Sequence, residues 1–108
     1  MRRQKLVKLN KGVDLKRDGF SKAYLSRLAL GLDLLYRWFC SLQPQPIVLW
    51  TRAGVNELLM RFVQDMFDSD VAHYLVVHAV LSFEKSYPHF HKKLSPTWHS
   101  IHTWKLRL

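Results

Sequence analysis

The chain has 108 residues, of which 48% are apolar, and it carries a formal net charge of +9 at neutral pH. This length suits one domain with a hydrophobic core, and an apolar share that includes four Trp and six Phe excludes wholesale disorder. A single cysteine, Cys40, excludes an internal disulfide, and no uncharged stretch is long enough to span a bilayer. We therefore expect a soluble, intracellular protein.

The basic residues are concentrated toward the two ends of the chain. Residues 1–27 contain nine Lys or Arg and residues 84–108 contain five, whereas residues 28–83 contain three against five acids. A positive surface of this kind favours a polyanion, nucleic acid first and anionic membrane second. The alternative is charge that serves only solubility.

The first part of the chain predicts a basic arm followed by a helix. Residues 1–19 are polar and basic, so we expect either a flexible arm or a frayed terminus. Ser21 is a candidate N-cap for a helix that runs to about Cys40. Gly31 costs about 1 kcal/mol relative to Ala inside a helix, so its presence predicts a close helix crossing there. The expected apolar stripe comprises Leu25, Leu28, Leu32, Leu35 and Phe39, widened by Tyr24, Ala29 and Trp38.

A proline-containing linker separates this helix from a second one. The segment 43–46, QPQP, ends the first helix because each proline disfavours the α conformation of the residue before it. Thr51 or Asn56 then opens a helix that ends near Phe67. Its apolar stripe is Val55, Leu58, Leu59, Phe62, Val63 and Met66. Its outer face predicts the solvated ion pairs Glu57–Arg61 and Arg61–Asp65.

Residues 71–87 form the most apolar stretch and are predicted to be the central helix of an all-α domain. The segment 68–70, DSD, offers capping oxygens before it, and Pro88 should stop it near Tyr87. The very short preceding turn predicts that the second and third helices are antiparallel neighbours. The expected core stripe is Ala72, Leu75, Val76, Ala79, Val80 and Phe83.

A basic loop leads into a fourth helix. Ser95 is a candidate N-cap and Pro96 would occupy the first helical position. The side chains of Trp98, Ile101 and Trp104 should face the core. The sequence thus predicts helices near 21–40, 53–67, 71–87 and 96–105, with no sheet.

No residue pattern in the chain predicts a cofactor. The histidines form two spaced pairs that together offer four ring nitrogens, but neither pair has a recognised zinc spacing. We therefore expect no metal site and no other cofactor. The two pairs are His89 with His91 and His99 with His102.

The remaining candidates for catalysis have simpler interpretations. Cys40 has no convincing base near it in sequence, so we interpret it as a small buried hydrophobic residue rather than a nucleophile. His73 and His78 on the central helix are interpreted as partly buried, hydrogen-bonded side chains. The chain by itself is not expected to be an enzyme.

The order of these elements resembles the core-binding domain of the tyrosine recombinases, also called phage integrases. KAYLSRLALGLDLLYRWFC is similar to the family's first helix, which begins with Ser or Thr, has Tyr a few residues on and ends in an aromatic residue. GVNELLMRFVQDMFDSD resembles its second helix. HAVLSFEKSYPHFHKKLSPTWHSIHTWKLRL resembles the end of the domain in a divergent eukaryotic branch. The matching positions are Ser21, Tyr24, Trp38 and Phe39, and then Leu94, Ser95, Trp98 and Trp104.

The resemblance covers residues 20–108 and implies a small SAM-like orthogonal bundle of four helices behind the flexible basic arm of residues 1–19. In that family this domain is one half of a clamp around duplex DNA. The family's catalytic Arg, Lys, His-x-x-Arg and Tyr set cannot be placed in this chain. The resemblance therefore implies a DNA-binding module without catalytic residues, nuclear if the source is eukaryotic. It also allows self-association or docking onto a separate catalytic domain.

The expected DNA contacts lie at the start of the first helix and around the end of the third. Most should reach phosphate oxygens, which give affinity but little sequence information. For each lysine the alternative is a solvated surface charge. The expected residues are Ser21, Lys22 and Arg27, and then Lys85, Lys92 and Lys93.

The sequence allows two functions other than DNA binding. A helical protein-interaction module, or a fragment that docks on a missing partner domain, would be favoured by an exposed patch of Trp98, Trp104 and residues 106–108. Attachment to a membrane surface is disfavoured, because the basic residues of 1–19 do not lie opposite a strong apolar stripe.

Overall fold

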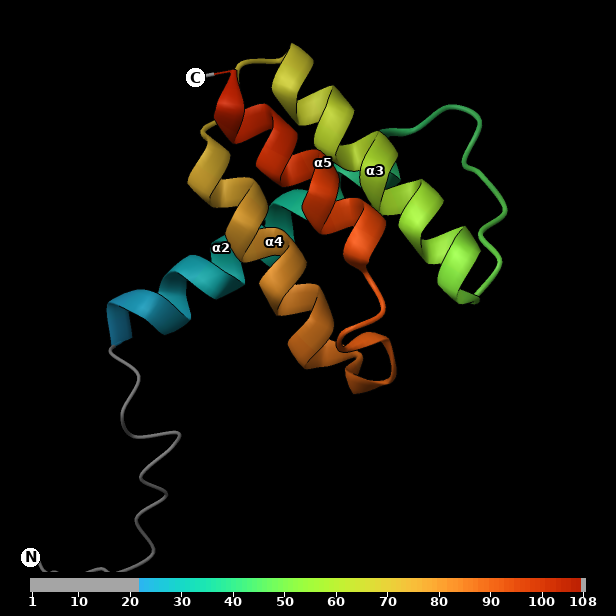
Figure 1. Cartoon of the computed structure of the whole chain (residues 1–108), viewed down its shortest axis with the longest axis horizontal. Coiled ribbons are helices and arrows are strands. Elements are labelled where there is room, and N and C mark those ends of the chain that lie inside the picture. The colour runs from blue at the N-terminus through green and yellow to red at the C-terminus, as the bar shows by residue number, and fades with distance from the viewer. Residues whose placement is uncertain (1–21, 108) are drawn as a thin grey trace, which may run out of the picture.

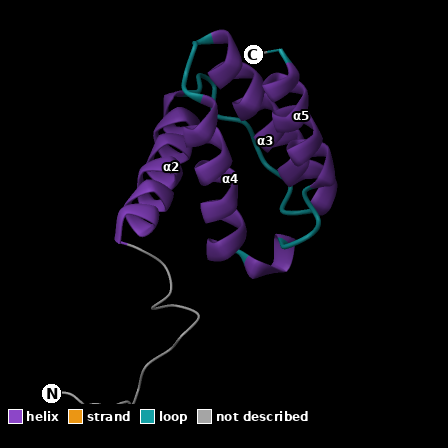
Figure 2. Ribbon diagram, turned by 60° about the vertical axis from the view of Figure 1, so that its left-hand side comes forward, coloured by secondary structure: helices purple, strands orange, loops and turns teal. Residues whose placement is uncertain are grey.

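The computed structural model describes residues 22–107 and shows a small four-helix bundle (Figure 1). Within these residues there are helices and loops and no strand (Figure 2). The predicted helices are confirmed, with every boundary within two residues of its predicted position. The arm of residues 1–19 and Ser21 lie outside the described residues. The elements are α2 (Lys22–Ser41), α3 (Arg52–Asp68), α4 (His73–Ser86), the 3-10 turn η1 (Pro88–Phe90) and α5 (Ser95–Leu106).

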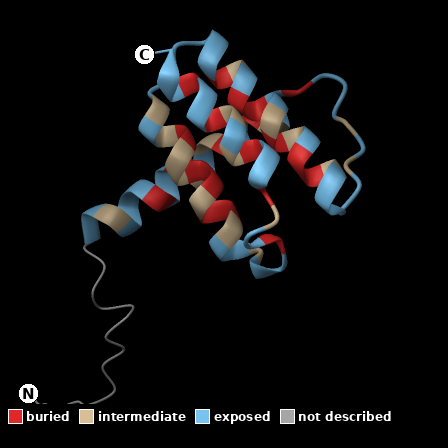
Figure 3. Ribbon diagram, viewed as in Figure 1, coloured by how far each residue is buried: buried red, intermediate tan, exposed pale blue. Residues whose placement is uncertain are grey.

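Helix α4 is the centre of the bundle, as the sequence predicts. It contacts α2, α3, α5 and η1, and its inward side chains lie in the hydrophobic core. Burial on several sides explains why this helix is apolar over most of its surface (Figure 3). Its fully buried or nearly buried residues are Val76, Ala79, Val80, Ser82 and Phe83.

Helix α2 crosses α4 at Gly31, which confirms the predicted close approach. A Cβ atom on Gly31 would lie 2.5 Å from the backbone nitrogen of Ala79 and 2.7 Å from the carbonyl carbon of His78. Next to this crossing, the hydroxyl of Ser82 donates a hydrogen bond to the carbonyl of Leu28. The absence of a side chain at Gly31 therefore lets the two backbones meet directly.

The buried face of α2 differs from the predicted stripe. Leu25 and Ala29 are exposed, whereas Leu28 and Gly31 pack against α4, so the buried face of α2 is narrower than the predicted stripe (Figure 3). The face that packs is Leu28, Gly31, Leu35 and Trp38.

Helices α3 and α4 contact each other, as predicted, but α5 packs against both of them and α3 packs mainly against α5. Asn56 meets Thr97 and Phe67 meets Trp104, so α3 and α5 run in the same direction. His73, near the start of α4, meets Trp104 near the end of α5, so these two helices are antiparallel. The turn after α3 thus joins two helices that diverge around α5 (Figure 1).

The segment 68–70 ends α3 rather than capping α4, contrary to the prediction. Asp70 adopts a left-handed conformation with φ of 58°. The N–H of Val71 bonds to the carbonyl of Met66 at 3.0 Å, and that of Asp70 to Phe67 at 3.2 Å. These two bonds form a Schellman motif, which satisfies the last carbonyls of α3. Helix α4 has Ala72 at its N-cap and no capping side chain.

Two helices begin with caps of different origin. Thr51, one of the two predicted candidates, caps α3 by accepting the N–H of Gly54 at 3.1 Å. Ser95 does not cap α5, because the helix already begins at Ser95 and its N-cap, Leu94, has no side-chain bond. Instead the buried Asn56 accepts the N–H of Thr97 at 3.3 Å. The cap of α5 is therefore supplied by α3.

The outer face of α3 lacks the predicted ion pairs. Among residues 22–107 the only ion pair is Asp33–Arg37 on α2, at 2.8 Å. Asp65 does not pair with Arg61 and instead accepts the indole N–H of Trp38 at 2.8 Å. A buried indole N–H requires an acceptor, whereas an exposed ion pair contributes little, so the bond to Trp38 is the favoured use of Asp65.

Candidate nucleic-acid interface

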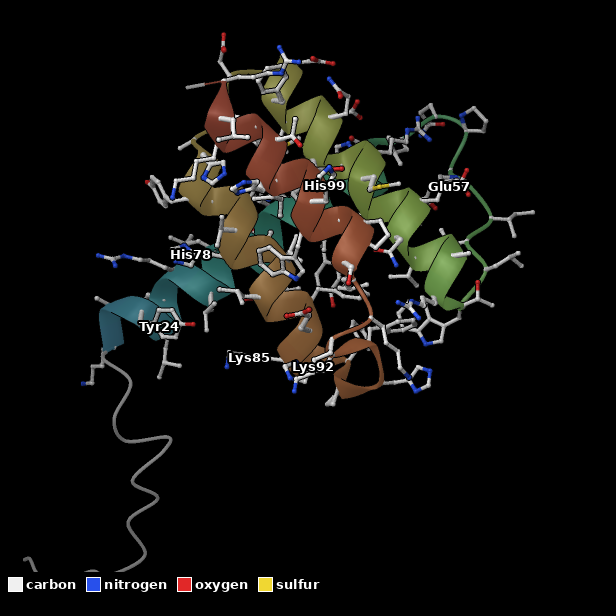
Figure 4. The ribbon with its side chains drawn as sticks, in the orientation of Figure 1. Tyr24, Glu57, His78, Lys85, Lys92 and His99 are labelled. Carbon is white, nitrogen blue, oxygen red and sulfur yellow. The ribbon has the colours of Figure 1, made fainter. Side chains whose placement is uncertain are left out.

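The end of α4 and the turn after it form a surface that we call the basic end: Lys85, His89, His91, Lys92 and Lys93. Lys85 lies in the last turn of α4, and Lys85 and Lys92 lie at the same end of the molecule (Figure 4). The side chains of Lys85 and Lys92 are exposed and that of Lys93 is half-buried. The structure therefore brings three predicted DNA-contacting residues together.

The basic end owes its shape to a short, well-bonded turn. After Pro88, the N–H of Phe90 bonds to the carbonyl of Tyr87 at 2.9 Å, and the N–H of Lys93 to that of Phe90 at 3.0 Å. Lys92 has a left-handed conformation, with φ of 63°, which reverses the chain. Phe90 and Leu94 are fully buried on either side of it. The apolar residues of the loop thus anchor it while the basic ones face outward.

A contact with α3 fixes the far side of the same loop. Asn56 donates through Nδ2 to the carbonyl of Lys93 at 2.9 Å, while its Oδ1 accepts the Thr97 hydroxyl at 2.7 Å. Asn56 also donates to the carbonyl of Arg52 at 2.9 Å. The backbone at Lys93 is therefore tied to both α3 and α5. A fixed backbone lowers the entropy that the neighbouring cations lose on binding an anion.

One acid lies beside these cations. Glu84 lines a shallow groove of about 310 Å³ together with Lys85 and His91. Its carboxylate accepts the indole N–H of Trp98 at 3.1 Å. Glu84 is thus engaged with α5, and the three lysines outnumber it.

The other predicted contacts lie on α2. Lys22 and Arg27 are exposed on the first half of that helix, and Ser21 falls outside the described residues. Figure 4 labels Tyr24 on this part of α2. The start of α2 and the end of α4 both lie on the lower side of the bundle in that view. The structure therefore provides two basic regions rather than one cluster.

An aromatic residue that the sequence did not mark as functional lies beside the basic end. Trp50, the second-last linker residue, contacts Phe90, Tyr87 and Phe83 edge-on, with ring centroids 5.0, 5.1 and 6.0 Å away. Its side chain nevertheless remains 55% exposed. These contacts join residues more than thirty positions apart, so no local pattern could reveal them. The only signal was an aromatic residue placed just before Arg52 at the end of a proline-containing linker.

Beside Trp50, two tyrosines are joined by a hydrogen bond. The hydroxyls of Tyr36 and Tyr87 lie 3.2 Å apart. This hydrogen bond raises the pKa of Tyr36, and burial and the neighbouring phenol act in the same direction. Tyr36 therefore stays uncharged at neutral pH.

The histidines and Cys40 do not form a reactive cluster. Within residues 22–107, no three His, Cys, Asp or Glu side chains are grouped as metal ligands. His73 is hydrogen-bonded to the carbonyl of Ile101 at 3.1 Å, as expected, but Nδ1 of His78 is buried without a partner. Cys40 is exposed, which contradicts its interpretation as a buried residue. It lies in the last turn of α2.

The patch that would have favoured a protein-interaction module is largely absent. Trp104 is buried between Phe67 and His73, and Trp98 is half-buried against Glu84. Leu106 is exposed, and residue 108 is outside the described part of the chain. No helix within residues 22–107 has the length and apolar character needed to cross a membrane.

No protein-family model, curated protein or solved structure matches this chain. Its function must therefore be inferred from its own residues. The basic end is the surface that brings together three of the predicted DNA-contacting residues.

Proposed function

We propose that this protein is a helical DNA-binding module, similar in role to the core-binding domain of a tyrosine recombinase, which holds duplex DNA without catalytic residues of its own. The observation that carries the proposal is the grouping of Lys85, in the last turn of α4, with Lys92 and Lys93 on the turn that follows, where the backbone at Lys93 is bonded to Asn56 of α3 and to Phe90. Lysines fixed in this way suit the regularly spaced phosphates of a duplex.

The distribution of charge supports contact through the ends of the domain. Fourteen of the seventeen Lys and Arg residues lie in 1–27 and 85–107, and the segment between them is slightly acidic. Lys22 and Arg27, exposed on the first half of α2, provide a second contact region separate from the basic end. Two separated basic regions favour a long polyanion over a small anionic ligand.

A helical protein-interaction module remains the second candidate. The exposed linker residues Ile47, Leu49 and Trp50 favour it, because they form apolar surface on a small domain. Charge favours DNA, since a partner on this surface must also accommodate the cations of the basic end. Fluorescence anisotropy with a short labelled duplex distinguishes the two.

The test compares two variants over a series of salt concentrations. If about four to six lysines and arginines neutralise phosphates, log K falls with log salt at a slope of about −0.9 per contact. Changing Lys85, Lys92 and Lys93 together to Ala should weaken binding to every sequence and flatten the slope by up to about three units. Arg61→Ala is the matched control, because Arg61 is exposed on α3 and has no ion pair among the described residues.

The proposal requires that the two variants differ. Both should keep the helical circular-dichroism spectrum of the parent, because all four side chains are exposed or half-buried. Absence of binding at low salt, or equal losses in the two variants, would favour the protein-interaction module.

A further inference from the structure

An apolar hollow lies directly beside the basic end and plays no part in the proposed phosphate contacts. It has a volume of about 170 Å³, and α2, the linker, α3 and α4 all contribute to its walls. Its aromatic walls are Trp50, Tyr36, Tyr87, Phe39 and Phe83, and the remaining walls are Leu and Val side chains. The hydroxyls of Tyr36 and Tyr87 are hydrogen-bonded to each other, so neither is without a partner.

Trp50 is held in a fixed position at this hollow. The rings of Phe83, Tyr87 and Phe90 contact it at angles of 61° to 88°, which is the edge-to-face arrangement that aromatic pairs favour. Yet 55% of its side chain is exposed. A large ring that is both fixed and half-exposed offers a preformed stacking surface, because little conformational entropy is lost when a second ring covers it.

Basic residues that adjoin Trp50 and its ring partner Phe90 in the sequence indicate what that second ring carries. Phe90, which touches Trp50, lies between His89 and His91, and the exposed Lys92 follows. Arg52, also exposed, comes two residues after Trp50. A neutral peptide side chain could fill the hollow but would leave Arg52 and Lys92 without counter-charge. A planar ring attached to phosphates satisfies both features.

We propose that Trp50 and the adjoining hollow bind an unpaired nucleobase, while the phosphates next to that base lie on Arg52 and the basic end. This inference rests on the proposed DNA binding and extends it, because paired bases inside a duplex are stacked on one another and cannot reach the ring. The preferred ligand is therefore a duplex that contains an extrahelical nucleotide. Stacking of one base on an aromatic side chain changes affinity by about 5- to 150-fold, or ~1–3 kcal/mol.

The test uses three duplexes of the same sequence in fluorescence anisotropy: one fully paired, one with a single bulged thymidine, and one with an abasic nucleotide at the bulge. The abasic bulge has the same backbone and bend but no base. The unaltered protein should bind the thymidine bulge about 5- to 150-fold more tightly than the abasic bulge. Trp50→Leu should abolish this preference and leave affinity for the paired duplex within about twofold, since stacking contributes nothing there.

Two further variants protect the test against a folding defect. Trp50→Phe keeps a smaller aromatic ring and should retain an intermediate preference. Trp98→Phe changes a half-buried tryptophan that contacts Glu84, and it should keep the full preference. Circular dichroism checks that each variant is folded.

The possible results separate this inference from the function on which it rests. Equal affinity for the two bulges, or a preference that survives in Trp50→Leu, overturns the stacking inference while salt-dependent binding of the paired duplex still supports the module. Failure to bind any of the three duplexes overturns both.

Discussion

Replacement of Asn56 with Ala is the most direct test of how this bundle is held together. Asn56 is buried and uses its amide fully, with two donated bonds and two accepted ones. Removal of the side chain deprives Thr97 of its acceptor and the Lys93 carbonyl of its donor. The Arg52 carbonyl keeps its helical partner, the N–H of residue 56 itself.

The expected loss follows from these contacts. Loss of a helix cap costs about 1 kcal/mol, and each buried polar group left unpaired costs about 1–3 kcal/mol. Since Thr97 can rotate its hydroxyl toward another acceptor, we expect the free energy of unfolding to fall by about 2–4 kcal/mol. This is a large share of the roughly 5–15 kcal/mol typical of a small domain.

Urea denaturation followed by circular dichroism measures this change. The midpoint should fall with little change in slope, because the surface exposed on unfolding stays nearly the same. Gln64→Ala is the matched control on the same helix, since its bond to Asp68 is exposed and its loss should cost about 0.5 kcal/mol or less. A loss for Asn56→Ala no larger than that of the control would refute the assignment of Asn56 as the cap of α5.

A double-mutant cycle isolates the Asn56–Thr97 contact. Thr97→Val removes the hydroxyl while keeping the shape of the side chain. The two changes together should cost less than the sum of the single changes, by about 0.5–3 kcal/mol, because each removes the same bond. Additive losses would show that the two side chains act independently.

Three further predictions test the helix crossing, the exposed cysteine and the proposal that the module is not catalytic. Gly31→Ala should lower the free energy of unfolding by about 1–3 kcal/mol in urea denaturation, because the new Cβ meets the backbone of α4, which cannot move aside as a side chain would. Ala has the better helix propensity, so unchanged or increased stability would contradict this prediction. Cys40 should react with a thiol reagent in the native protein about as completely as in denaturant, since it is exposed; protection of the thiol without denaturant would count against its placement. The chain alone should form no covalent adduct on a nicked duplex and release no cleaved strand, and an adduct seen on a denaturing gel would overturn the assignment as a non-catalytic module.

Local sequence patterns were enough to predict the four helices and one close contact between them. Apolar residues at helical spacing defined the four helices, and Pro88 and the linker prolines marked two of their ends. Gly31 also predicted the crossing with α4, because a helix retains such a residue at a cost of about 1 kcal/mol. These features are local, so they can be derived from the order of the residues.

The sequence did not reveal which neighbours cover each helix or what the polar side chains bind. Asn56 was a candidate for opening α3 but caps α5, and Asp65 was expected on the surface but accepts the indole of Trp38. Trp50 gains its neighbours because η1 folds back onto the end of the linker. Each of these contacts joins residues from separate helices or loops. Their partners are set by how the helices cross around α4, and helical periodicity indicates which face of a helix is buried but not which neighbour buries it.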